Sequence, residues 1–284
     1  MNLMHSIPTP SWVAGLKVVI SKCRSCDRSM VLSKVSARKA GISMHGGWYC
    51  SSRCLNSGAE KELAGLLPKR AWQGNEFSRM PLGLNLIRCG LLSRRQYEEA
   101  FDEQKKDGGE IGEHIVRGGF VTEKQLAVAI AAQWACPVFE VPKHFVKSKI
   151  QIPLTLTELN SAIPLHYVSA SNLLLVGFLY RVRYGLLSAI EQIAQCKTQP
   201  CFVTLSDFQK AKENLVSARG NRGEAAPKEV KFEGPQSPAE MARILTSYCV
   251  DLEAEEATIK RCNEHIWARL KSDSTAADLL FKAE

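Results

Sequence analysis

The sequence has no apolar run long enough to cross a membrane. The longest apolar stretch, NLLLVGFLY from Asn172, is about half the ~18 residues that a membrane-spanning helix needs. The N-terminus also lacks a basic segment followed by an apolar one, which is the pattern of an export signal. We therefore predict that the chain does not insert into a membrane and that it lies in the cytoplasm.

The sequence also lacks the motifs of common enzymes. No stretch reads G-x-x-x-x-G-K-[ST], so the phosphate-binding loop of nucleotide hydrolases is absent. No Ser/His/Asp or Cys/His arrangement, no paired carboxylates in a recognisable loop and no cofactor fingerprint is present, and the 6 histidines are scattered. We predict that the protein is not an enzyme.

Acidic residues are scarce at the start of the chain. Residues 1–75 carry 3 Asp or Glu against 11 Lys or Arg, whereas residues 76–215 carry 14 against 16 and residues 216–284 carry 12 against 10. The net charge of +8 therefore comes from the N-terminal segment. A basic segment of this kind can contact nucleic acid, although it is more often a solvated surface.

The 10 cysteines fall into two classes. Six lie singly in apolar segments without an export signal, and we expect them to be buried, reduced thiols: Cys89, Cys136, Cys196, Cys201, Cys249 and Cys262. The other four form two close pairs, Cys23-x2-Cys26 and Cys50-x3-Cys54. This spacing favours a closed tetrahedral zinc site with a structural role, and the alternatives are a redox or disulfide role and a site without metal. His45, between the two pairs, is expected to be a solvated loop residue rather than a ligand.

Residues 20–67 resemble a treble-clef zinc finger. KCRSCDRSM supplies the knuckle, SMHGGWYC a strand that ends at Cys50, and CSSRCLNSGAEKELAGLL a helix. The resemblance implies that the zinc ion holds a small module together, since so short a segment buries little apolar surface by itself.

A second pattern is an internal repeat. The stretch PLGLNLIRCGLLSRRQYEEAFDEQ at residues 81–104 recurs 29 residues later as EIGEHIVRGGFVTEKQLAVAIAAQ at residues 110–133, with 6 identities. Each copy predicts a short helix, a glycine stop at Gly90 or Gly119, and a second helix that opens with a capping box. Two such copies predict a pseudo-symmetric surface suited to a two-fold ligand or partner.

The repeat and the segment after it resemble the MshEN domain over residues 77–215. MshEN is the N-terminal domain of type II secretion and type IV pilus assembly ATPases, and its pattern reads R-L-G, two residues, L-V, two, G, six, L, three, L, two, Q. The resemblance implies a cyclic di-GMP site formed by residues from both copies: Leu82, Gly83, Leu86, Arg88, Gly90, Gln104, Ile111, Gly112, Ile115, Arg117, Gly119 and Gln133.

Downstream of the repeat, the resemblance implies an α/β sandwich. AIPLHYV and LLLVGFLY match its paired strands, YGLLSAIEQIAQ its helix and TQPCFVTL a further strand. SDFQKAKENLV matches a closing helix with Ser206 or Asp207 as the N-cap.

Two departures from the family pattern change what the resemblance implies. The arginine that opens each copy in the family is Pro81 in the first copy and Glu110 in the second, and a carboxylate repels a phosphate. The ATPase motor is also missing, because the chain has no phosphate-binding loop. Arg88 and Arg117 either replace the lost arginines at the phosphates or only complement the carbonyl ends of their helices.

The predicted fold class is α+β, with four segments along the chain. They are a basic zinc-finger-like module (1–75), an MshEN-like domain (76–216), a Gly- and Pro-rich linker (217–236) and a helix followed by short β-strands (237–284). Within the MshEN-like domain we expect a helical tandem repeat at residues 77–136 and an α/β subdomain at residues 137–216.

These observations together predict a non-enzymatic regulatory or adaptor protein. It is expected to dock on secretion, pilus or motility machinery, to hold structural zinc, and to bind cyclic di-GMP weakly if at all. The alternative is a nucleic-acid-associated regulator that acts through the basic zinc module.

Overall fold

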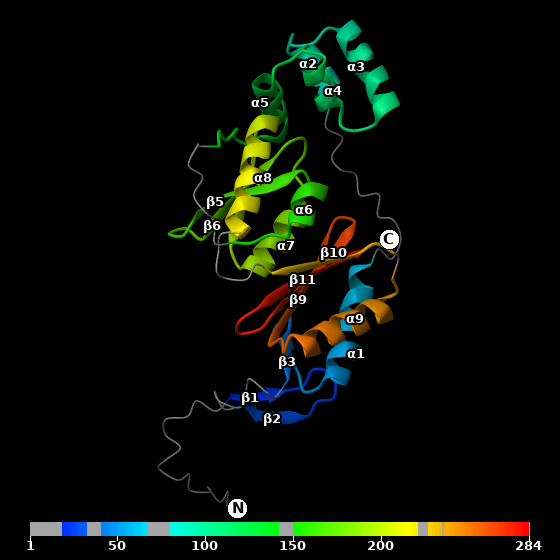
Figure 1. Ribbon diagram of the computed structural model, residues 1–284, viewed down its shortest axis with the longest axis vertical. Helices are drawn as coiled ribbons and strands as arrows, with labels where there is room; N and C mark the ends of the chain where they lie inside the picture. The colour runs from blue at the N-terminus through cyan, green and yellow to red at the C-terminus, as the bar shows by residue number, and fades with distance from the viewer. Residues whose placement is uncertain are drawn as a thin grey trace, which may run out of the picture.

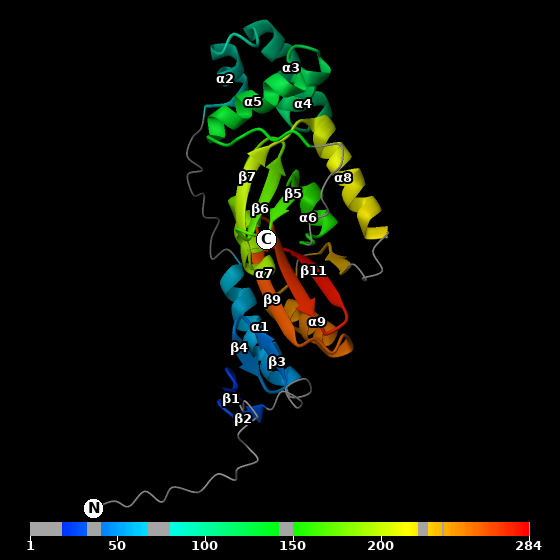
Figure 2. The same cartoon turned by 90° about the vertical axis from the view of Figure 1, so that its left-hand side faces the viewer.

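The computed structural model describes residues 19–32, 41–67, 80–141, 150–220, 227–234 and 236–283. The fold class is α+β, as predicted. The described residues form an elongated molecule with three tiers (Figures 1 and 2). The tandem repeat lies at one end, a three-stranded sheet with its helices lies in the middle, and a six-stranded sheet lies toward the other end, which carries β1 (Val19–Lys22) and β2 (Ser29–Leu32). Within the described ranges, no helix combines the length and the apolar character needed to cross a membrane.

The N-terminal segment consists of two hairpins and a helix: β1 (Val19–Lys22), β2 (Ser29–Leu32), β3 (Ile42–Met44), β4 (Gly47–Tyr49) and α1 (Ser52–Leu66). SMHGGWYC, predicted to be one strand, is a hairpin, because His45 and Gly46 have φ angles of 50° and 71° and reverse the chain. Ser51 caps α1 by accepting a hydrogen bond from the backbone N–H of Cys54. The predicted order of knuckle, strand and helix is otherwise present.

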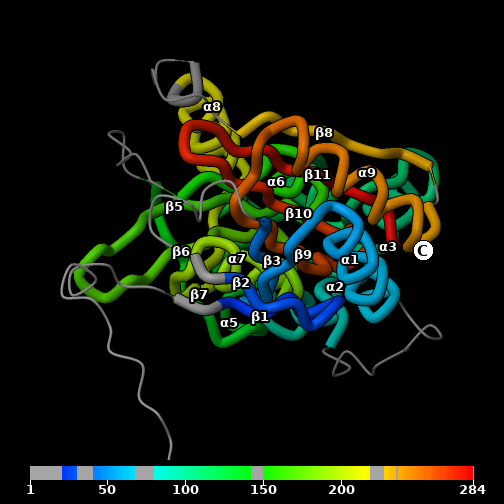
Figure 3. Tube along the Cα trace, turned by 90° about the horizontal axis from the view of Figure 1, so that it is seen from below, coloured from blue at the N-terminus to red at the C-terminus, as the bar shows by residue number. Residues whose placement is uncertain are grey.

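A six-stranded sheet joins the two ends of the chain in the order β4-β3-β9-β10-β11-β8. Its C-terminal strands are β8 (Lys228–Phe232), β9 (Glu256–Cys262), β10 (His265–Lys271) and β11 (Ala276–Lys282). β3 pairs with β9 in parallel, and β8 pairs with β11 in parallel. Helices α1 and α9 (Pro238–Asp251) lie side by side over one face of this sheet (Figures 1 and 3).

Two predicted segments are therefore corrected. The zinc-finger-like module and the C-terminal segment are not separate units, because they share this sheet and one apolar core. The predicted linker at residues 217–236 contains the end of α8 and the whole of β8. Val230 and Phe232 of β8 pack against the shared core, which explains why this charged segment is ordered as a strand. The boundary predicted between residues 75 and 76 lies outside the described residues.

The middle tier is a three-stranded sheet between helices. Its strands have the order β5-β6-β7, and its elements are α6 (Leu154–Leu159), β5 (Ala162–Val168), β6 (Leu173–Phe178), α7 (Tyr184–Ala194), β7 (Lys197–Phe202) and α8 (Leu205–Gly220). The predicted strands and helices are confirmed, and α6 is an addition. The predicted N-cap of α8 is wrong: Thr204 Oγ1, rather than Ser206 or Asp207, accepts the capping bond, from the Asp207 N–H at 3.1 Å.

The tandem repeat contains four helices: α2 (Leu82–Arg88), α3 (Arg94–Asp107), α4 (Ile111–Arg117) and α5 (Glu123–Trp134). Both predicted capping boxes form, at the starts of α3 and α5. Gly90 and Gly119 have φ angles of 70° and 69°, the left-handed conformation that ends α2 and α4. The local chemistry of the repeat thus gives the helix boundaries that were predicted.

The three tiers share a continuous core. Buried residues of the repeat pack on α7 and on the three-stranded sheet, and Trp267 and Leu280 of the six-stranded sheet extend the same cluster. On this face of the six-stranded sheet, Arg269 and Asp278 form a buried ion pair with Nε–Oδ1 and Nη2–Oδ2 distances of 2.7 and 2.8 Å. Trp267 Nε1 donates to the same carboxylate at 2.7 Å.

Candidate metal centre and repeat surface

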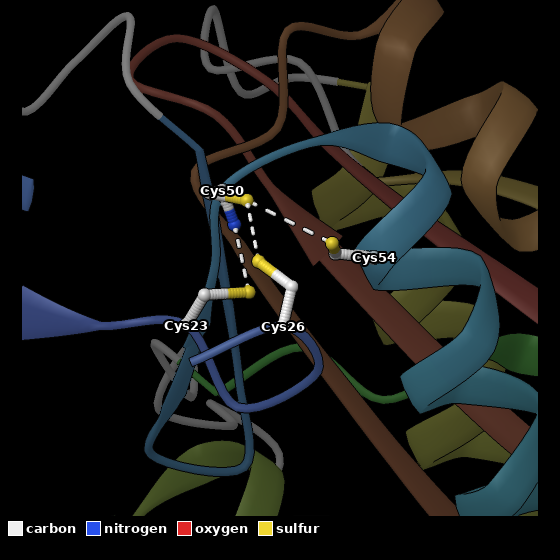
Figure 4. A group of neighbouring side chains, drawn as sticks. All are labelled: Cys23, Cys26, Cys50 and Cys54. Atoms are coloured by element: carbon white, nitrogen blue, oxygen red, sulfur yellow. Dashed lines mark hydrogen bonds between the residues drawn. The ribbon is translucent and has the colours of Figure 1, made fainter. Parts of the chain in front are cut away.

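The structure brings the four paired cysteines together at one point. Cys23 and Cys26 come from the turn between β1 and β2, Cys50 follows β4, and Cys54 lies in the first turn of α1 (Figure 4). All four sulfur atoms lie within 4.8 Å of one another, with Sγ–Sγ distances of 3.5 Å for Cys26–Cys50 and 3.7 Å for Cys50–Cys54. Four sulfurs held about 2.3 Å from one tetrahedral zinc ion lie about 3.8 Å apart, so the cluster fits that ion.

The electrostatics of the cluster favour thiolates that share protons. Burial raises the pKa of Cys23, but the backbone N–H groups of Cys50, Cys26 and Ser25 outweigh it and bring that pKa down to about 6. The hydrogen bond with Cys26 raises the pKa of Cys50 to about 12, since Cys50 keeps the shared proton. A zinc ion requires all four thiols to be deprotonated, so its binding releases the protons that the cluster holds.

His45 lies in the turn between β3 and β4 and faces the C-terminal sheet. Its Nε2 accepts a hydrogen bond from the backbone N–H of Ile259 at 3.2 Å, so the prediction of a solvated loop residue is wrong. Burial, followed by the charge of Lys260, holds the pKa of His45 below its usual value of 6.5. Among the described residues, the group that could hold a metal ion consists of the four cysteines.

The remaining six cysteines are free thiols with different exposures. Four are buried as predicted: Cys196, Cys201, Cys249 and Cys262. Cys136 is half-buried. The prediction is wrong for Cys89, which is exposed because it lies at the outward-facing end of α2.

In the second copy of the repeat, the altered motif position is paired with a distant cation. Glu110 Oε1 lies 2.6 Å from Arg181 Nη2, in the loop after β6. The neighbouring Tyr180 donates its hydroxyl to Glu113 Oε1 at 3.0 Å, and burial, together with Glu113, raises its pKa. Tyr180 and Arg181 therefore lie against the start of α4, where the family resemblance implies ligand contacts.

The motif glycines allow close packing of rings. A Cβ atom at Gly83 would lie 2.1 Å from the ring of Tyr97, and one at Gly112 would lie 3.2 Å from Tyr180 and 3.1 Å from Leu126. Both glycines are buried, so their faces are covered by side chains of this chain itself.

The motif glutamines form a reciprocal pair of hydrogen bonds. Gln104 at the end of the first copy donates to the carbonyl of Gly109, the residue before the second copy. Gln133 at the end of the second copy donates to the carbonyl of Met80, the residue before the first copy. The two bonds are equivalent under the repeat, so the glutamines close the pseudo-symmetric unit.

The other predicted ligand residues divide between surface and core. Arg88 and Arg117 are exposed; Arg88 Nη2 lies 3.3 Å from Asn85 Oδ1, and Arg117 Nη1 lies 3.6 Å from Asp107 Oδ2. Gly90 and Gly119 are exposed turns, Leu82 and Ile111 are half-buried, and Leu86 and Ile115 are fully buried. The arginines are thus the only charged members of the set at the surface.

Sequence reasoning missed Tyr180 and Arg181. They lie about seventy positions beyond their partners, at separations of 67 and 71 residues. The reversed charge at Glu110 was the one available signal, because a half-buried carboxylate is more stable when it is paired with a cation. The sequence does not indicate which cation pairs with Glu110.

Comparisons with known proteins find a partial similarity to a pilus-assembly ATPase. No protein-family model matches the chain. Over 129 residues, 45% of this chain, it is 24% identical to the type IV pilus assembly ATPase PilB of Thermus thermophilus, and the matched stretch spans 14% of PilB. The similarity to this ATPase therefore covers less than half of the present chain and a small part of PilB.

Two solved structures overlap about half of the chain. The structure of MshE with cdg matches 48% of this chain and 99% of its own, with a TM-score of 0.40 and 20% identity. The N-terminal domain of XpsE matches 46% of this chain and 91% of its own, with a TM-score of 0.38 and 13% identity.

Proposed function

We propose that this protein is a non-enzymatic adaptor or regulator that docks on secretion, pilus or motility machinery and carries a structural zinc ion at its four-cysteine cluster. The observation that carries the proposal is the closed tandem repeat, whose glutamines bond reciprocally to the two motif starts. The partial similarity to PilB supports docking on pilus or secretion machinery. The given sequence holds no phosphate-binding loop, which supports a non-enzymatic role.

Binding of cyclic di-GMP is expected to be weak in this chain. Losing a charge-assisted contact costs about 1.5–3 kcal/mol, so replacing both motif arginines weakens binding on the order of a hundredfold or more. Arg88 and Arg117 are the exposed cations that could compensate. Glu110 pairs with Arg181, so an arginine introduced at position 110 without a change at position 181 would be repelled by the Arg181 guanidinium.

Calorimetry with cyclic di-GMP on the purified full chain tests the ligand part of the proposal. If Arg88 and Arg117 compensate, weak binding falls with added salt and is lost in the Arg88→Ala/Arg117→Ala variant. Restoring the motif requires Pro81→Arg and Glu110→Arg together with Arg181→Ser, which removes the repelling guanidinium. A restored variant that folds and still binds nothing leaves only the partner-docking function.

Affinity purification of the tagged chain from its native cells tests the docking part. We expect subunits of secretion, pilus or motility machinery to be recovered with the wild type at levels well above a tag-only control. Recovery of nucleic acid with no such subunit contradicts the proposal.

A specific observation favours nucleic acid as the second candidate. Arg24, Arg28 and Arg53 are exposed on the segments that carry the cysteines. Fluorescence anisotropy of labelled single-stranded RNA and DNA measures nucleic-acid binding. If the chain binds through these arginines, the affinity should fall steeply as the salt concentration rises and should be lower in a variant in which the three arginines are replaced by Ala.

A further inference from the structure

The two ends of the chain build one domain into which the rest of the chain is inserted. Its N-terminal part is the cysteine cluster with β3, β4 and α1, and its C-terminal part is β8 to β11 with α9. The repeat and the three-stranded sheet lie between these parts in sequence. The cysteine cluster therefore belongs to the same folding unit as the C-terminal sheet.

Hydrogen bonds connect the two parts at separate places. β3 pairs with β9 through Ser43 and Met44, and the Ser43 N–H donates to the carbonyl of Glu255 at 2.9 Å. The His45 ring accepts from the Ile259 N–H. At the far end of α1, Arg261 Nη1 donates to the carbonyl of Leu66 at 3.1 Å.

Helix α1 also supplies half of an apolar interface. Leu55, Ala59 and Leu63 of α1 are fully buried, and they pack in one cluster with Met241 and Leu245 of α9. Gly58 permits the contact between α1 and β4, since a Cβ atom there would lie 2.3 Å from the ring of Tyr49. Removing α1 would expose the apolar face of α9 and of the sheet beneath it.

The position of α1 depends on the cluster at its start. Cys54 lies in the first turn of α1 and Cys50 ends β4, while Cys23 and Cys26 belong to a two-stranded hairpin. Backbone bonds join this hairpin to β4 only around Trp48 among the described residues, where the Arg24 N–H donates to the Trp48 carbonyl at 3.0 Å. A metal ion that binds all four thiolates fixes the hairpin, the end of β4 and the start of α1 at once, so its binding energy becomes folding energy.

We propose that metal binding at the four cysteines controls the folding of the C-terminal sheet and of α9, although the cysteines lie near the opposite end of the chain. This inference rests on the zinc site of the proposed function. In the metal-loaded protein α1 packs beside α9, and loss of the metal releases α1 and opens the core that both helices share.

Hydrogen exchange on the full-length protein, with and without a zinc chelator and with a reductant present throughout, tests the inference. We expect chelation to speed amide exchange by about tenfold or more in β9, β10, β11 and α9 as well as in α1. Helices α2 to α5 are expected to exchange unchanged, and added zinc should reverse the effect. The Cys54→Ser variant should behave like the chelated protein, with Cys89→Ser as the control thiol outside the cluster.

The reciprocal measurement uses the C-terminal helix. If metal and C-terminal folding are coupled, a change that weakens the packing of α9 must weaken zinc binding by the same factor. Leu245→Ala, at a fully buried position, should lower zinc affinity by about tenfold or more in competition with a chromophoric chelator. Val250→Ala on the same helix, at a position that is 56% exposed, should leave the affinity unchanged.

The outcomes separate the inference from the zinc site itself. Purified protein that contains no zinc and takes up none overturns the zinc site and the inference with it. Zinc that binds and is removed while exchange in β9 to β11 stays constant overturns only the inference. Equal zinc affinity in Leu245→Ala and wild type also overturns it, and the chelation experiment decides the case if the Cys54→Ser variant does not fold.

Discussion

The buried pair of Arg269 and Asp278 should be among the most sensitive points of the fold. Their side chains are 8% and 3% exposed, and the carboxylate accepts two bonds from Arg269 and one from Trp267. The Asp278→Ala substitution removes all three acceptor contacts. The substitution leaves the Arg269 guanidinium and the Trp267 indole N–H buried in a low-dielectric environment without the carboxylate that accepted their hydrogen bonds.

The expected loss of stability follows from this geometry. Removing one partner of a buried ion pair costs about 3–5 kcal/mol because the other charge stays buried without compensation. A domain is stable by about 5–15 kcal/mol in total, so Asp278→Ala takes a large part of that margin. Replacing both partners by apolar residues, as in Arg269→Met/Asp278→Leu, should cost less than Asp278→Ala alone, because no buried charge remains.

Urea denaturation of the zinc-loaded protein, followed by tryptophan fluorescence, measures these differences. The matched control is Glu256→Ala, which breaks the Lys271–Glu256 pair on the same sheet, where the side chains are 42% and 44% exposed and 3.7 Å apart. An exposed pair of this kind contributes about 0–1 kcal/mol. The reasoning is refuted if Asp278→Ala costs no more than Glu256→Ala, or if the double variant is less stable than Asp278→Ala.

Three further predictions concern single contacts. Glu229→Ala removes the carboxylate that accepts from the Leu154 and Thr155 N–H groups at the start of α6, so urea denaturation should show a loss of about 1–2 kcal/mol, with Glu229→Gln closer to wild type. The folded-state pKa of His45 is lowered, so its contribution to stability is present above the unfolded value of 6.5 and is lost as the pH falls through the folded value. Urea midpoints at about pH 7.5 and 5.5 should therefore differ more in wild type than in His45→Asn, which tolerates the positive φ, and an equal difference contradicts the assignment. Glu110→Arg should lower the melting temperature by placing two guanidinium groups together, and Arg181→Glu in the same chain should recover it; additive effects would exclude a direct pair.

The repeat could be predicted from the sequence because its determinants are local. Ser93 with Gln96 and Thr122 with Gln125 form their capping boxes within one helical turn, and the glycine stops act on their own helices. The cysteine pairs are similar, since each pair spans only a few residues. Local spacing therefore identified both the helix boundaries and the candidate metal ligands.

The joining of the two chain ends could not be predicted in the same way. β3 contributes only three residues to the sheet, and two of them pair with β9, more than two hundred positions away. β8 reads as a charged linker because three of its five residues, Lys228, Glu229 and Lys231, are charged and only Val230 and Phe232 reach the core. Pairing over such distances depends on the whole fold, so short strands of this kind leave little trace in the sequence.

The two copies of the repeat differ in a way that explains how the second one is held. Three carboxylates of the second copy contact the middle tier: Glu110 binds Arg181, Glu113 accepts from Tyr180, and Glu123 accepts from the Ser206 N–H and hydroxyl. The equivalent positions of the first copy are Pro81, Leu84 and Arg94, none of which is acidic. The second copy is thus specialised for contact within the chain.

Exchanging one pair of equivalent residues tests this asymmetry. Glu113→Leu gives the second copy the residue of the first and should destabilise the protein by about 1–3 kcal/mol, because the half-buried Tyr180 hydroxyl loses its charged acceptor. Leu84→Glu makes the opposite exchange at a position that is 51% exposed, and its effect should stay within about 0.5 kcal/mol. Tyr180→Phe combined with Glu113→Leu should cost little more than Glu113→Leu alone, since both remove the same bond. Equal losses of stability in Leu84→Glu and Glu113→Leu would show that these two equivalent positions contribute equally to the free energy of unfolding. The carboxylates of the second copy would then need another explanation.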